Sequence, residues 1–344
     1  MAFSVVIKDR EENVHVEMGR TILEALLAAG IDYPHGCRSG NCGACKSILH
    51  NGEVEMSPFS EYALSPEEQN RGLVLACRSV PWSDCLISPV GQDETVAHAS
   101  RRLACNVLDI SEATHDIRII RLAITAGGPF DFSPGQYAEV IFGGLPPRDF
   151  SMANQSGADT VEFHIRLVSG GAVSTHVLDH LEAGDEVDVT GPRGTAYYRP
   201  SHTGPIIAAA GGSGLAPIKA IIDAALANGT PRDIHLYFGV RGEQDLYLAN
   251  YFEARAAEHS HFRFVPVLSE PYGKTQRRTG YLADVLGEDF NDLDGYKAYL
   301  AGPPVMVETC VGKLDSLGIR QQNIHADAFY TTAEKIALGE DQGG

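Results

Sequence analysis

A ten-residue stretch, GCRSGNCGAC at residues 36–45, holds three of the seven cysteines of the chain. Cys37, Cys42 and Cys45 follow one another at C-x4-C and C-x2-C spacings, and Cys77 stands farther along in the motif LACRS. An odd, unevenly clustered set of cysteines suits a metal centre better than a framework of disulfides. The three cysteines of the stretch, together with Cys77, are therefore expected to hold a metal centre through four thiolates.

The spacing also indicates the kind of centre. C-x4-C-x2-C with a distant fourth cysteine is the pattern that holds a plant-type [2Fe-2S] cluster. Because the cluster and its thiolates carry negative charge, the loop must turn backbone N–H groups toward the sulfur atoms, and Gly36, Gly40 and Gly43 permit the positive-φ turns that this requires. Ser39 can add a hydroxyl donor. The alternatives are a structural zinc site, which normally takes paired C-x2-C knuckles or histidines, and a chance cluster of buried thiols.

The wider sequence around these cysteines resembles a known domain. YPHGCRSGNCGACKSILHNGEV and LACRSV are similar to the plant-type ferredoxin domain that is fused to flavin reductases, such as those serving multicomponent aromatic-ring oxygenases. This resemblance implies a β-grasp ferredoxin domain over residues 1–90.

A second group of motifs points to a flavin. In RDFS, Arg148 and Ser151 end a predicted strand, where a guanidinium can neutralise a diphosphate and a hydroxyl can reach a flavin edge. Gly170 and Gly171 open a helix expected to start near Ala172, whose first N–H groups can hold the same diphosphate. Taken singly, the first motif is also compatible with a surface arginine on a strand, and the glycine pair with a simple turn.

In their order along the chain, these motifs resemble the FAD-binding barrel of the ferredoxin-NADP reductase superfamily. The family usually has tyrosine where this chain has Phe150, so stacking on the flavin can survive but a phenolic hydrogen bond cannot. Phe329 or Tyr330 is expected to cover one flavin face, unless these aromatic residues belong to the core. The resemblance implies FAD contacts from Arg148, Phe150, Ser151, His164, Ile165, Arg166, Gly171, Ala172, Val173, Ser174 and Phe329.

A third motif, AAAGGSGLAP at residues 208–217, follows a buried strand and opens a helix. Its glycines allow a dinucleotide to approach the backbone while the helix N-terminus faces the diphosphate. The motif resembles the G-G-[ST]-G-[LI]-[AT]-P form of the same superfamily, as does YLAGPPVM at residues 299–306, which frames the nicotinamide in relatives. The expected NAD contacts are Gly211, Gly212, Ser213, Gly214, Arg241, Glu270, Gly302, Pro303 and Met306.

The chain departs from the superfamily where nicotinamide and flavin should meet. Relatives commonly carry cysteine where Ala301 stands, so a thiol that helps to position the nicotinamide is missing. Ser151 and Asp327 are then the expected flavin-proximal members of the catalytic constellation, although Asp327 is equally compatible with a plain surface carboxylate.

Discrimination between NADH and NADPH depends on charge near the adenine ribose. Glu270, just past the strand FRFVPVL, can accept a hydrogen bond from the 2′-hydroxyl and repel a 2′-phosphate. Lys274, Arg277, Arg278 and Arg241 lie close by and would favour NADPH if they faced the ligand. NADH is the expected donor, with NADPH as the alternative.

These sites need several domains to position them. At 344 residues and 37.0 kDa the chain exceeds the size at which one hydrophobic core usually keeps growing. The net charge of −18 argues against a nucleic-acid or anionic-membrane partner. There is no N-terminal signal-like segment and no apolar run of about 18 residues, so a cytoplasmic protein is expected. Cys85, Cys105 and Cys310 stand in apolar patterns and are predicted to be packing residues.

The predicted elements give the expected architecture. A helix is expected in TILEALLAAG with Thr21 as its cap, and a hairpin turn at His50-Asn51-Gly52. The fold class is a multidomain α+β and α/β chain. Its expected parts are a β-grasp ferredoxin domain at 1–90, a linker at 91–102, an antiparallel β-barrel for FAD at 103–203, a doubly wound parallel sheet for the nucleotide at 204–330 and a tail at 331–344.

Together the three sites predict electron transfer. A nicotinamide releases two electrons at once and a [2Fe-2S] cluster accepts one, so a flavin is the needed intermediary, giving the order NADH, FAD, cluster and protein acceptor. Over residues 3–330 the chain resembles the reductase components of naphthalene-type ring-hydroxylating dioxygenases, which implies a Rieske-type ferredoxin or a terminal oxygenase as partner. Open alternatives are a diiron monooxygenase or deoxysugar dehydrase system, a redox sensor without turnover, and a zinc-stabilised interaction protein.

Overall fold

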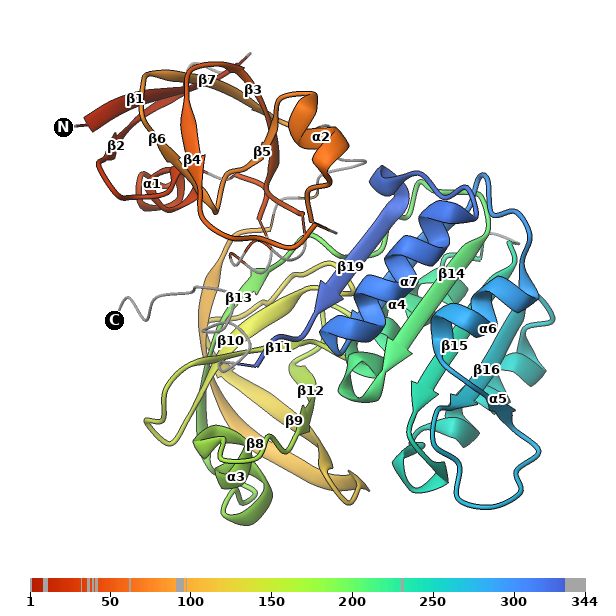
Figure 1. Cartoon of the computed structure of the whole chain (residues 1–344). Coiled ribbons are helices and arrows are strands. Elements are labelled where there is room, and N and C mark those ends of the chain that lie inside the picture. Colours follow the sequence, from red (N-terminus) through yellow and green to blue (C-terminus); the bar gives the residue numbers. More distant parts are fainter. Residues whose placement is uncertain are drawn as a thin grey trace. The chain divides into compact units, whose positions relative to one another are not determined.

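The computed structural model describes residues 2–8, 12–31, 33–35, 38, 40, 43–61, 63–90, 96, 98–229 and 232–331. The predictions for Gly36, Cys37, Ser39 and Cys42, for half of the proposed linker (91–95 and 97) and for the tail from residue 332 lie outside the described residues. The chain forms two compact units, with boundaries after Asp93 and after Phe329. Figure 1 shows the elements of each unit.

The first unit is built on a mixed five-stranded sheet in the order β2-β1-β7-β3-β5. Its strands are β1 (Ala2–Ile7), β2 (Asn13–Glu17), β3 (Lys46–Asn51), β5 (Leu73–Leu75) and β7 (Cys85–Pro89). Helix α1 (Ile22–Ala28) begins at the predicted cap, since Thr21 and Glu24 form a reciprocal capping box. Its apolar face joins Val5, Ile7 and Val16 in one core. A short helix, α2 (Pro66–Asn70), completes this unit together with a strand pair, β4 (Val54–Met56) and β6 (Ser79–Pro81).

The predicted hairpin at His50-Asn51-Gly52 is wrong. The chain does turn there, with Gly52 at φ 104°, but β3 pairs with β5 and β7 while β4 pairs with β6. A Cβ atom at Gly52 would lie 2.6 Å from the carbonyl oxygen of Asp84 and 2.7 Å from the sulfur of Cys85. The glycine therefore lets the chain pass close to the start of β7 on its way to a different sheet.

The first half of the second unit is an antiparallel six-stranded sheet in the order β11-β10-β13-β8-β9-β12. The strands are β8 (Arg101–Thr114), β9 (Ile117–Ala126), β10 (Tyr137–Phe142), β11 (Arg148–Ser151), β12 (Thr160–Arg166) and β13 (Glu186–Arg193). Strand β8 begins two residues inside the segment suggested as a linker. Alternate side chains fill the interior, among them Leu103, Leu122 and Phe163.

The outer strands of this sheet meet only in part, which leaves an open edge. Met152, directly after β11, forms a bridge with Phe163 of β12, and the Ala153 N–H donates to the Glu162 carbonyl oxygen. Beyond that bridge, His164–Arg166 pair with β9 on one side and, within the described residues, with no strand on the other. The barrel is therefore nearly closed, with free strand edge at one end.

The second half of this unit is a parallel sheet in the order β17-β16-β15-β14-β18-β19. Its strands are β14 (Ile206–Gly211), β15 (Ile234–Val240), β16 (Phe262–Leu268), β17 (Arg278–Thr279), β18 (Lys297–Gly302) and β19 (Ile324–Ala328). Successive residues of β14 belong to different cores, Ile206 and Ala208 on one face and Ile207 and Ala209 on the other. Both faces are therefore covered, as a run of consecutive apolar residues predicts.

Helices on the two faces complete the doubly wound arrangement (Figure 1). Residues of α4 (Leu215–Ala227) and α5 (Ala249–Glu258) pack in one core, and those of α6 (Leu282–Asp289) and α7 (Pro304–Ser316) in the other. The strand order reverses at β14, between β15 and β18, so the carboxyl ends of β14 and β18 flank the switch point. The predicted fold class is confirmed. In the described part of the chain no helix has the length and apolarity needed to cross a membrane.

Candidate functional site

The sheet of the first unit brings two of the predicted cluster ligands together. Cys45 directly precedes β3 and Cys77 follows β5, and these strands pair with Lys46 opposite Leu75. The Ala76 N–H continues the ladder by donating to the Cys45 carbonyl oxygen at 3.1 Å. Both cysteines are buried, with 3% and 5% of their surface exposed, and neither is in a disulfide.

The described glycines of the cysteine loop have the backbone conformations that the sequence predicted. Gly40 has φ 78° and Gly43 has φ 69°. A Cβ atom at Gly40 would lie 2.8 Å from Cβ of Phe59 and 2.8 Å from Cγ of Arg78. The loop is therefore both tightly turned and closely packed at Gly40.

A buried arginine from another part of the chain packs against this loop. Arg78 is 7% exposed, and its Nε and Nη2 atoms are buried without a hydrogen-bond partner. Burying a cation without compensation is strongly unfavourable. Two buried thiols, one of them next in sequence to a buried arginine without a hydrogen-bond partner for Nε and Nη2, are a donor set that fits an anionic iron–sulfur cluster.

The remaining described cysteines are packing residues, as predicted. Cys85, Cys105 and Cys310 are buried and not in disulfides. Burial raises the pKa of the Cys85 thiol, raises that of Cys105 to about 11 and raises that of Cys310 to about 12. Thiols held so firmly protonated are poor metal ligands.

Strand β11 presents the RDFS motif at the end of the barrel. The Arg148 side chain is exposed and donates to the carbonyl oxygen of Pro147 at 2.8 Å, with no carboxylate partner in the described part of the chain. Phe150 packs against the barrel core, with its ring centroid 6.3 Å from that of Phe142 and 6.4 Å from that of Phe163. The Arg148 guanidinium is therefore available to an anionic ligand, and Phe150 presents a half-buried ring.

Ser151 connects the barrel to the parallel sheet. Its Oγ donates to Oδ2 of Asp327 at 3.3 Å, and Asp327 lies opposite Ala301 in the pairing of β18 with β19. Phe329 follows two residues later, where its N–H donates to the Gly302 carbonyl oxygen at 2.9 Å and its ring packs against the core. The two residues expected beside the flavin thus meet at the loop expected to frame the nicotinamide.

Helix α3 (Ala172–Asp179) begins at Gly171 without a side-chain cap. The N–H groups of Ala172, Val173 and Ser174 consequently have no partner within the helix, and such a terminus favours an anionic ligand. The Ser174 hydroxyl is committed to the turn, since Oγ lies 3.1 Å from both the Val168 nitrogen and the Gly171 carbonyl oxygen. The helix therefore offers its backbone, rather than the serine side chain, to a diphosphate.

Two expected flavin ligands on β12 have their side chains engaged within the protein. Ile165 is buried in the barrel core. His164 lies 3.2 Å from Oε1 of Glu162 through Nε2 and 3.0 Å from the Tyr247 hydroxyl through Nδ1. Burial lowers the pKa of His164, so the ring is neutral, with Nε2–H donating to the carboxylate. The Tyr247 hydroxyl is also 3.5 Å from the Gly212 carbonyl oxygen, which links β12 to the glycine loop.

The glycine-rich loops after β14 and β18 pack directly on each other. A Cβ atom at Gly214 would collide with the carbonyl group of Ala301, and one at Gly302, where φ is 143°, would lie 2.8 Å from the Gly211 carbonyl oxygen. One at Gly211 would lie 2.6 Å from the sulfur of Met306. These glycines are thus required by contact between the two loops, in addition to the ligand approach that the motif predicted. Ser213 lies half-buried in the turn Gly212–Gly214 that precedes α4.

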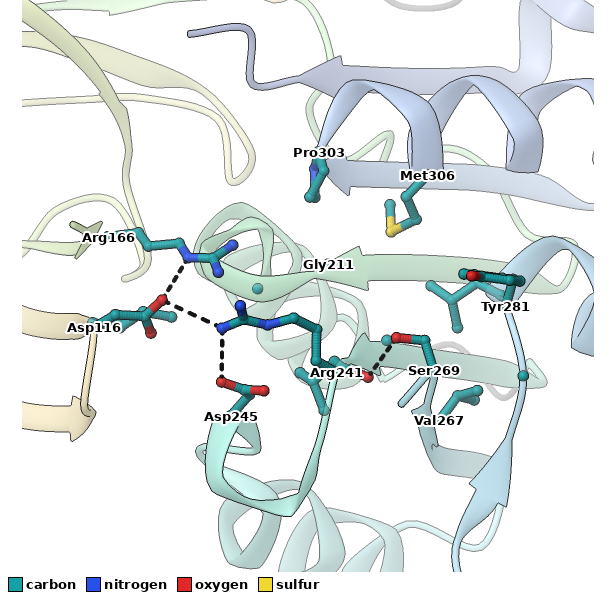
Figure 2. A pocket seen from close by; sticks show the side chains of 16 residues that line it. Asp116, Arg166, Gly211, Arg241, Asp245, Val267, Ser269, Tyr281, Pro303 and Met306 are labelled. Carbon is teal, nitrogen blue, oxygen red and sulfur yellow. Dashed lines mark hydrogen bonds and ion pairs between the residues drawn. The ribbon is translucent and has the colours of Figure 1, made fainter. Parts of the chain in front are cut away.

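A cavity of about 230 Å³ opens beside these loops at the carboxyl ends of the strands (Figure 2). The predicted site residues that line it are Arg166, Gly211, Gly212, Arg241, Pro303 and Met306. Arg166, predicted for the flavin, therefore shares a cavity with residues predicted for the nicotinamide nucleotide.

Ion pairs join the barrel to the parallel sheet across this cavity (Figure 2). Asp116, in the turn between β8 and β9, accepts from Nε of Arg166 at 2.9 Å and lies 3.8 Å from Nη2 of Arg241. Arg241 in turn pairs with Asp245 at 3.1 Å. Although burial alone would raise it, the pKa of Asp116 is lowered by hydrogen bonds from Thr114 and Arg166. The cavity therefore has a fixed network of two cations and two anions at one side.

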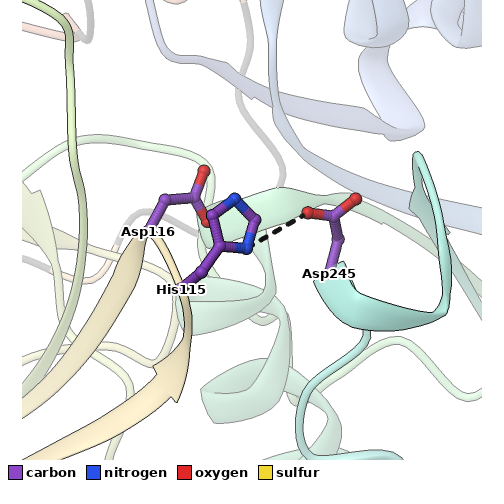
Figure 3. A group of neighbouring side chains, drawn as sticks. All are labelled: His115, Asp116 and Asp245. Carbon is purple, nitrogen blue, oxygen red and sulfur yellow. Dashed lines mark ion pairs between the residues drawn. The ribbon is translucent and has the colours of Figure 1, made fainter.

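His115, Asp116 and Asp245 also form a group whose potential metal-ligating atoms lie within 4.8 Å of one another (Figure 3). His115 is 3.8 Å from Asp245, between Nδ1 and Oδ1. Since Arg166 and Arg241 already pair with the two carboxylates, the guanidinium groups take the place of a metal cation here.

The arginines expected near the adenine ribose are paired with carboxylates other than Glu270. Arg277 pairs with Glu243 and Glu253, and Arg278 pairs with two carboxylates of α6. Glu270 and Lys274 are exposed, and neither lines the cavity. Glu270 does lie beside Arg241, to whose carbonyl oxygen its N–H donates at 2.8 Å.

Several cavity residues were missed by the sequence analysis: Asp116, Asp245, Ser269 and Tyr281. Ser269 directly follows β16, so its place at the carboxyl end of a parallel strand was an available signal. Asp116 gave no such signal, because sequence alone does not tell which turn of the barrel faces the sheet.

The sequence matches three families of domains in succession. Residues 5–81 match the 2Fe-2S iron–sulfur cluster binding domain, residues 104–198 the oxidoreductase FAD-binding domain and residues 209–312 the oxidoreductase NAD-binding domain. These matches confirm the predicted cofactors FAD, [2Fe-2S] and NAD(P)H.

The chain is similar over almost its whole length to reductases of different oxygenase systems. The reductase component of naphthalene 1,2-dioxygenase/salicylate 5-hydroxylase systems from Ralstonia sp. is 40% identical over 95% of this chain and 98% of its own. The phenol hydroxylase P5 protein of Acinetobacter pittii is 34% identical, over 98% and 97%. Among solved structures, the Amycolatopsis cytochrome P450 reductase is 37% identical with a TM-score of 0.75, over 95% and 98%.

The contact between the two glycine loops predicts a position-specific effect of one methyl group. Gly214→Ala should lower the free energy of unfolding by about 1–3 kcal/mol, because its Cβ would collide with the Ala301 carbonyl. Gly242→Ala is the matched control: its φ is −141° and the nearest atom to its Cβ is 3.8 Å away, so it should change stability by less than about 0.5 kcal/mol. Denaturant unfolding of both variants measures the difference, and equal stabilities would contradict the packing.

Proposed function

This chain belongs to the family of reductases that combine a 2Fe-2S domain, an FAD-binding domain and an NAD-binding domain, and on that premise we propose that it carries electrons from NADH to a Rieske-type ferredoxin or terminal oxygenase of aromatic catabolism. In general terms it is an NAD(P)H-dependent reductase of a multicomponent oxygenase system. The proposal adds the donor, the acceptor and the residues that serve each of them.

The observation that carries the proposal is the hydrogen bond between Ser151 and Asp327. It joins the open end of the barrel to the carboxyl end of β19, opposite Ala301 of β18. A flavin edge held by the barrel and a nicotinamide held by the loop after β18 would therefore meet at these two side chains. Ala301 supplies no thiol, so Ser151 and Asp327 are left to hold the two rings in place.

The barrel fits an FAD through three groups of its own. The exposed guanidinium of Arg148 and the N–H groups at the start of α3 suit the diphosphate. The unpaired edge of His164–Arg166 offers backbone groups to the polar side of the flavin ring. Once bound, the flavin supplies the ability to take two electrons together and release them one at a time.

The parallel sheet fits a dinucleotide at its switch point. Gly211 and Gly212, in the loop that leads into α4, line the cavity, where Arg166 and Arg241 suit an anionic diphosphate. NADH is favoured over NADPH because Arg277 and Arg278 are each neutralised by two carboxylates, while Glu270 remains exposed beside Arg241. These arrangements give a 2′-phosphate little cationic support.

The first unit supplies the one-electron outlet. Cys45 and Cys77 are brought together in its core, and with Cys37 and Cys42 they complete the four thiolates of the spacing. A Rieske ferredoxin is the preferred acceptor because of the similarity to the naphthalene dioxygenase reductase component. The similar proteins named for phenol hydroxylase and cytochrome P450 make those oxygenases the alternatives.

Loss of one cluster thiolate should separate flavin reduction from electron delivery. In Cys77→Ser, anaerobic NADH should still bleach the flavin absorbance, whereas NADH-dependent reduction of cytochrome c should fall at least tenfold, because the outlet is lost. Stopped-flow absorbance and steady-state assays measure the two steps. Cys85→Ala, another buried cysteine of the same unit, should leave both unchanged. Full cytochrome c reduction by iron-depleted Cys77→Ser would overturn the proposed electron path.

A second variant tests the nucleotide site. Arg241→Gln should raise KM for NADH roughly three- to tenfold, since it removes a charge-assisted contact worth about 1 kcal/mol at a half-exposed position. Arg277→Gln removes an arginine that is paired outside the cavity lining and should leave KM unchanged. Steady-state kinetics with NADH and NADPH make the comparison. An unchanged KM in Arg241→Gln, or an equal rise in both variants, would contradict the assignment.

A further inference from the structure

Arg78 directly follows the cluster cysteine Cys77 and is fixed in place by its backbone. Its N–H donates to the Leu75 carbonyl oxygen at 2.9 Å, and its carbonyl oxygen accepts from the Ser57 N–H at 2.9 Å. The side-chain stem lies against Gly40, since a Cβ there would be 2.8 Å from Cγ and 3.0 Å from Cδ of Arg78. Gly40 stands between Cys37 and Cys42 in the sequence, so the buried stem contacts the cysteine loop at this glycine.

The guanidinium group at the end of that stem has no anionic partner in the described part of the protein. Nε and Nη2 are buried without a hydrogen bond, and no described carboxylate comes within ion-pair distance. Lys46, another largely buried cation of this unit, does have an anionic partner, since it pairs with Glu68 at 2.6 Å. A buried arginine without a carboxylate is unfavourable unless an anion of another kind lies near it.

We propose that Arg78 acts as a fixed positive charge that raises the reduction potential of the [2Fe-2S] cluster, an inference that rests on the proposed function. One-electron reduction adds one negative charge to the cluster and its thiolates. A neighbouring cation stabilises the reduced form more than the oxidised form, and the net charge near a cluster is one of the factors that set its potential. Arginine suits this role because its guanidinium stays protonated even when it is buried.

A purely structural role for Arg78 makes a different prediction. In that case the stem fills the space beside Gly40 and Phe59, and its loss would affect cluster retention and stability rather than the potential. Charge and shape are separated by two substitutions: Arg78→Gln removes the charge and keeps a polar stem, whereas Arg78→Lys keeps the charge and changes the head group.

The experiment is an anaerobic redox titration of the full-length holoprotein, with the reduced cluster followed by EPR and the FAD by absorbance. For Arg78→Gln we expect the ratio of reduced to oxidised cluster at a fixed potential to fall about tenfold, a downward shift of about 59 mV for one electron. Arg78→Lys should retain more than half of the wild-type effect, and the FAD potential should stay constant in both variants. Arg71→Gln removes the same charge from an exposed site in this unit and should shift the cluster less than half as far as Arg78→Gln.

Each other outcome has a definite meaning. An unchanged cluster potential in Arg78→Gln, or an equal shift in Arg78→Gln and Arg78→Lys, overturns the charge role. If Arg78→Gln loses its iron and sulfide, Arg78→Lys decides: a loaded cluster near the wild-type potential supports the role, and loss there too overturns it in favour of packing. Wild-type protein without iron and sulfide would instead overturn the proposed function itself, and this inference with it.

Discussion

Direct backbone contact between two loops is the constraint on which the nucleotide site depends. The loop after β14 and the loop after β18 touch through Gly211, Gly214, Ala301 and Gly302, with no room for side chains between them. Because these strands flank the point at which the strand order reverses, the contact fixes the shape of the crevice at the carboxyl edge of the sheet. A methyl group at this contact would push apart the two loops that we propose as the dinucleotide site.

Polar contacts then hold the barrel against this edge of the sheet. Ser151 reaches Asp327, His164 reaches Tyr247, and Asp116 reaches Arg241, each pair joining one half of the second unit to the other. Each contact is a single hydrogen bond or ion pair of modest strength. Acting at three places around one crevice, they restrict how the two halves can move relative to each other. Flavin and nicotinamide chemistry needs such restriction, since its rate depends on how the two rings are placed.

Much of this arrangement follows from local sequence patterns. Residues close together in the sequence determine these features. Examples are the cysteine spacing, the Thr21 cap and the apolar run of β14. Ser151 and Asp327 were expected from resemblance to lie beside the flavin, and the structure brings these two residues into contact with each other. The glycine motif was also recognised, although its packing against the loop after β18 was not, because that partner lies about ninety residues away.

The predictions that failed, and the residues that were missed, all depend on which distant segment of the chain packs against a given strand or side chain. The turn at Gly52 was recognised but its strands were paired wrongly, because β3 and β4 find partners far along the chain. Asp116 and Tyr247 gave no sign of facing the cavity loops until the halves of the unit were assembled. Arg78 looked like an ordinary charged residue after a cysteine, and its burial without a partner is visible only in three dimensions.

The central claim is that one chain accepts two electrons at once from its donor and releases them one at a time through its iron–sulfur cluster. Stoichiometric anaerobic reduction of the purified protein with dithionite, followed by absorbance and EPR, tests it most directly. The account predicts uptake of three electrons per chain, two by the flavin and one by the cluster. Uptake of two electrons with no EPR signal from a reduced cluster would contradict it.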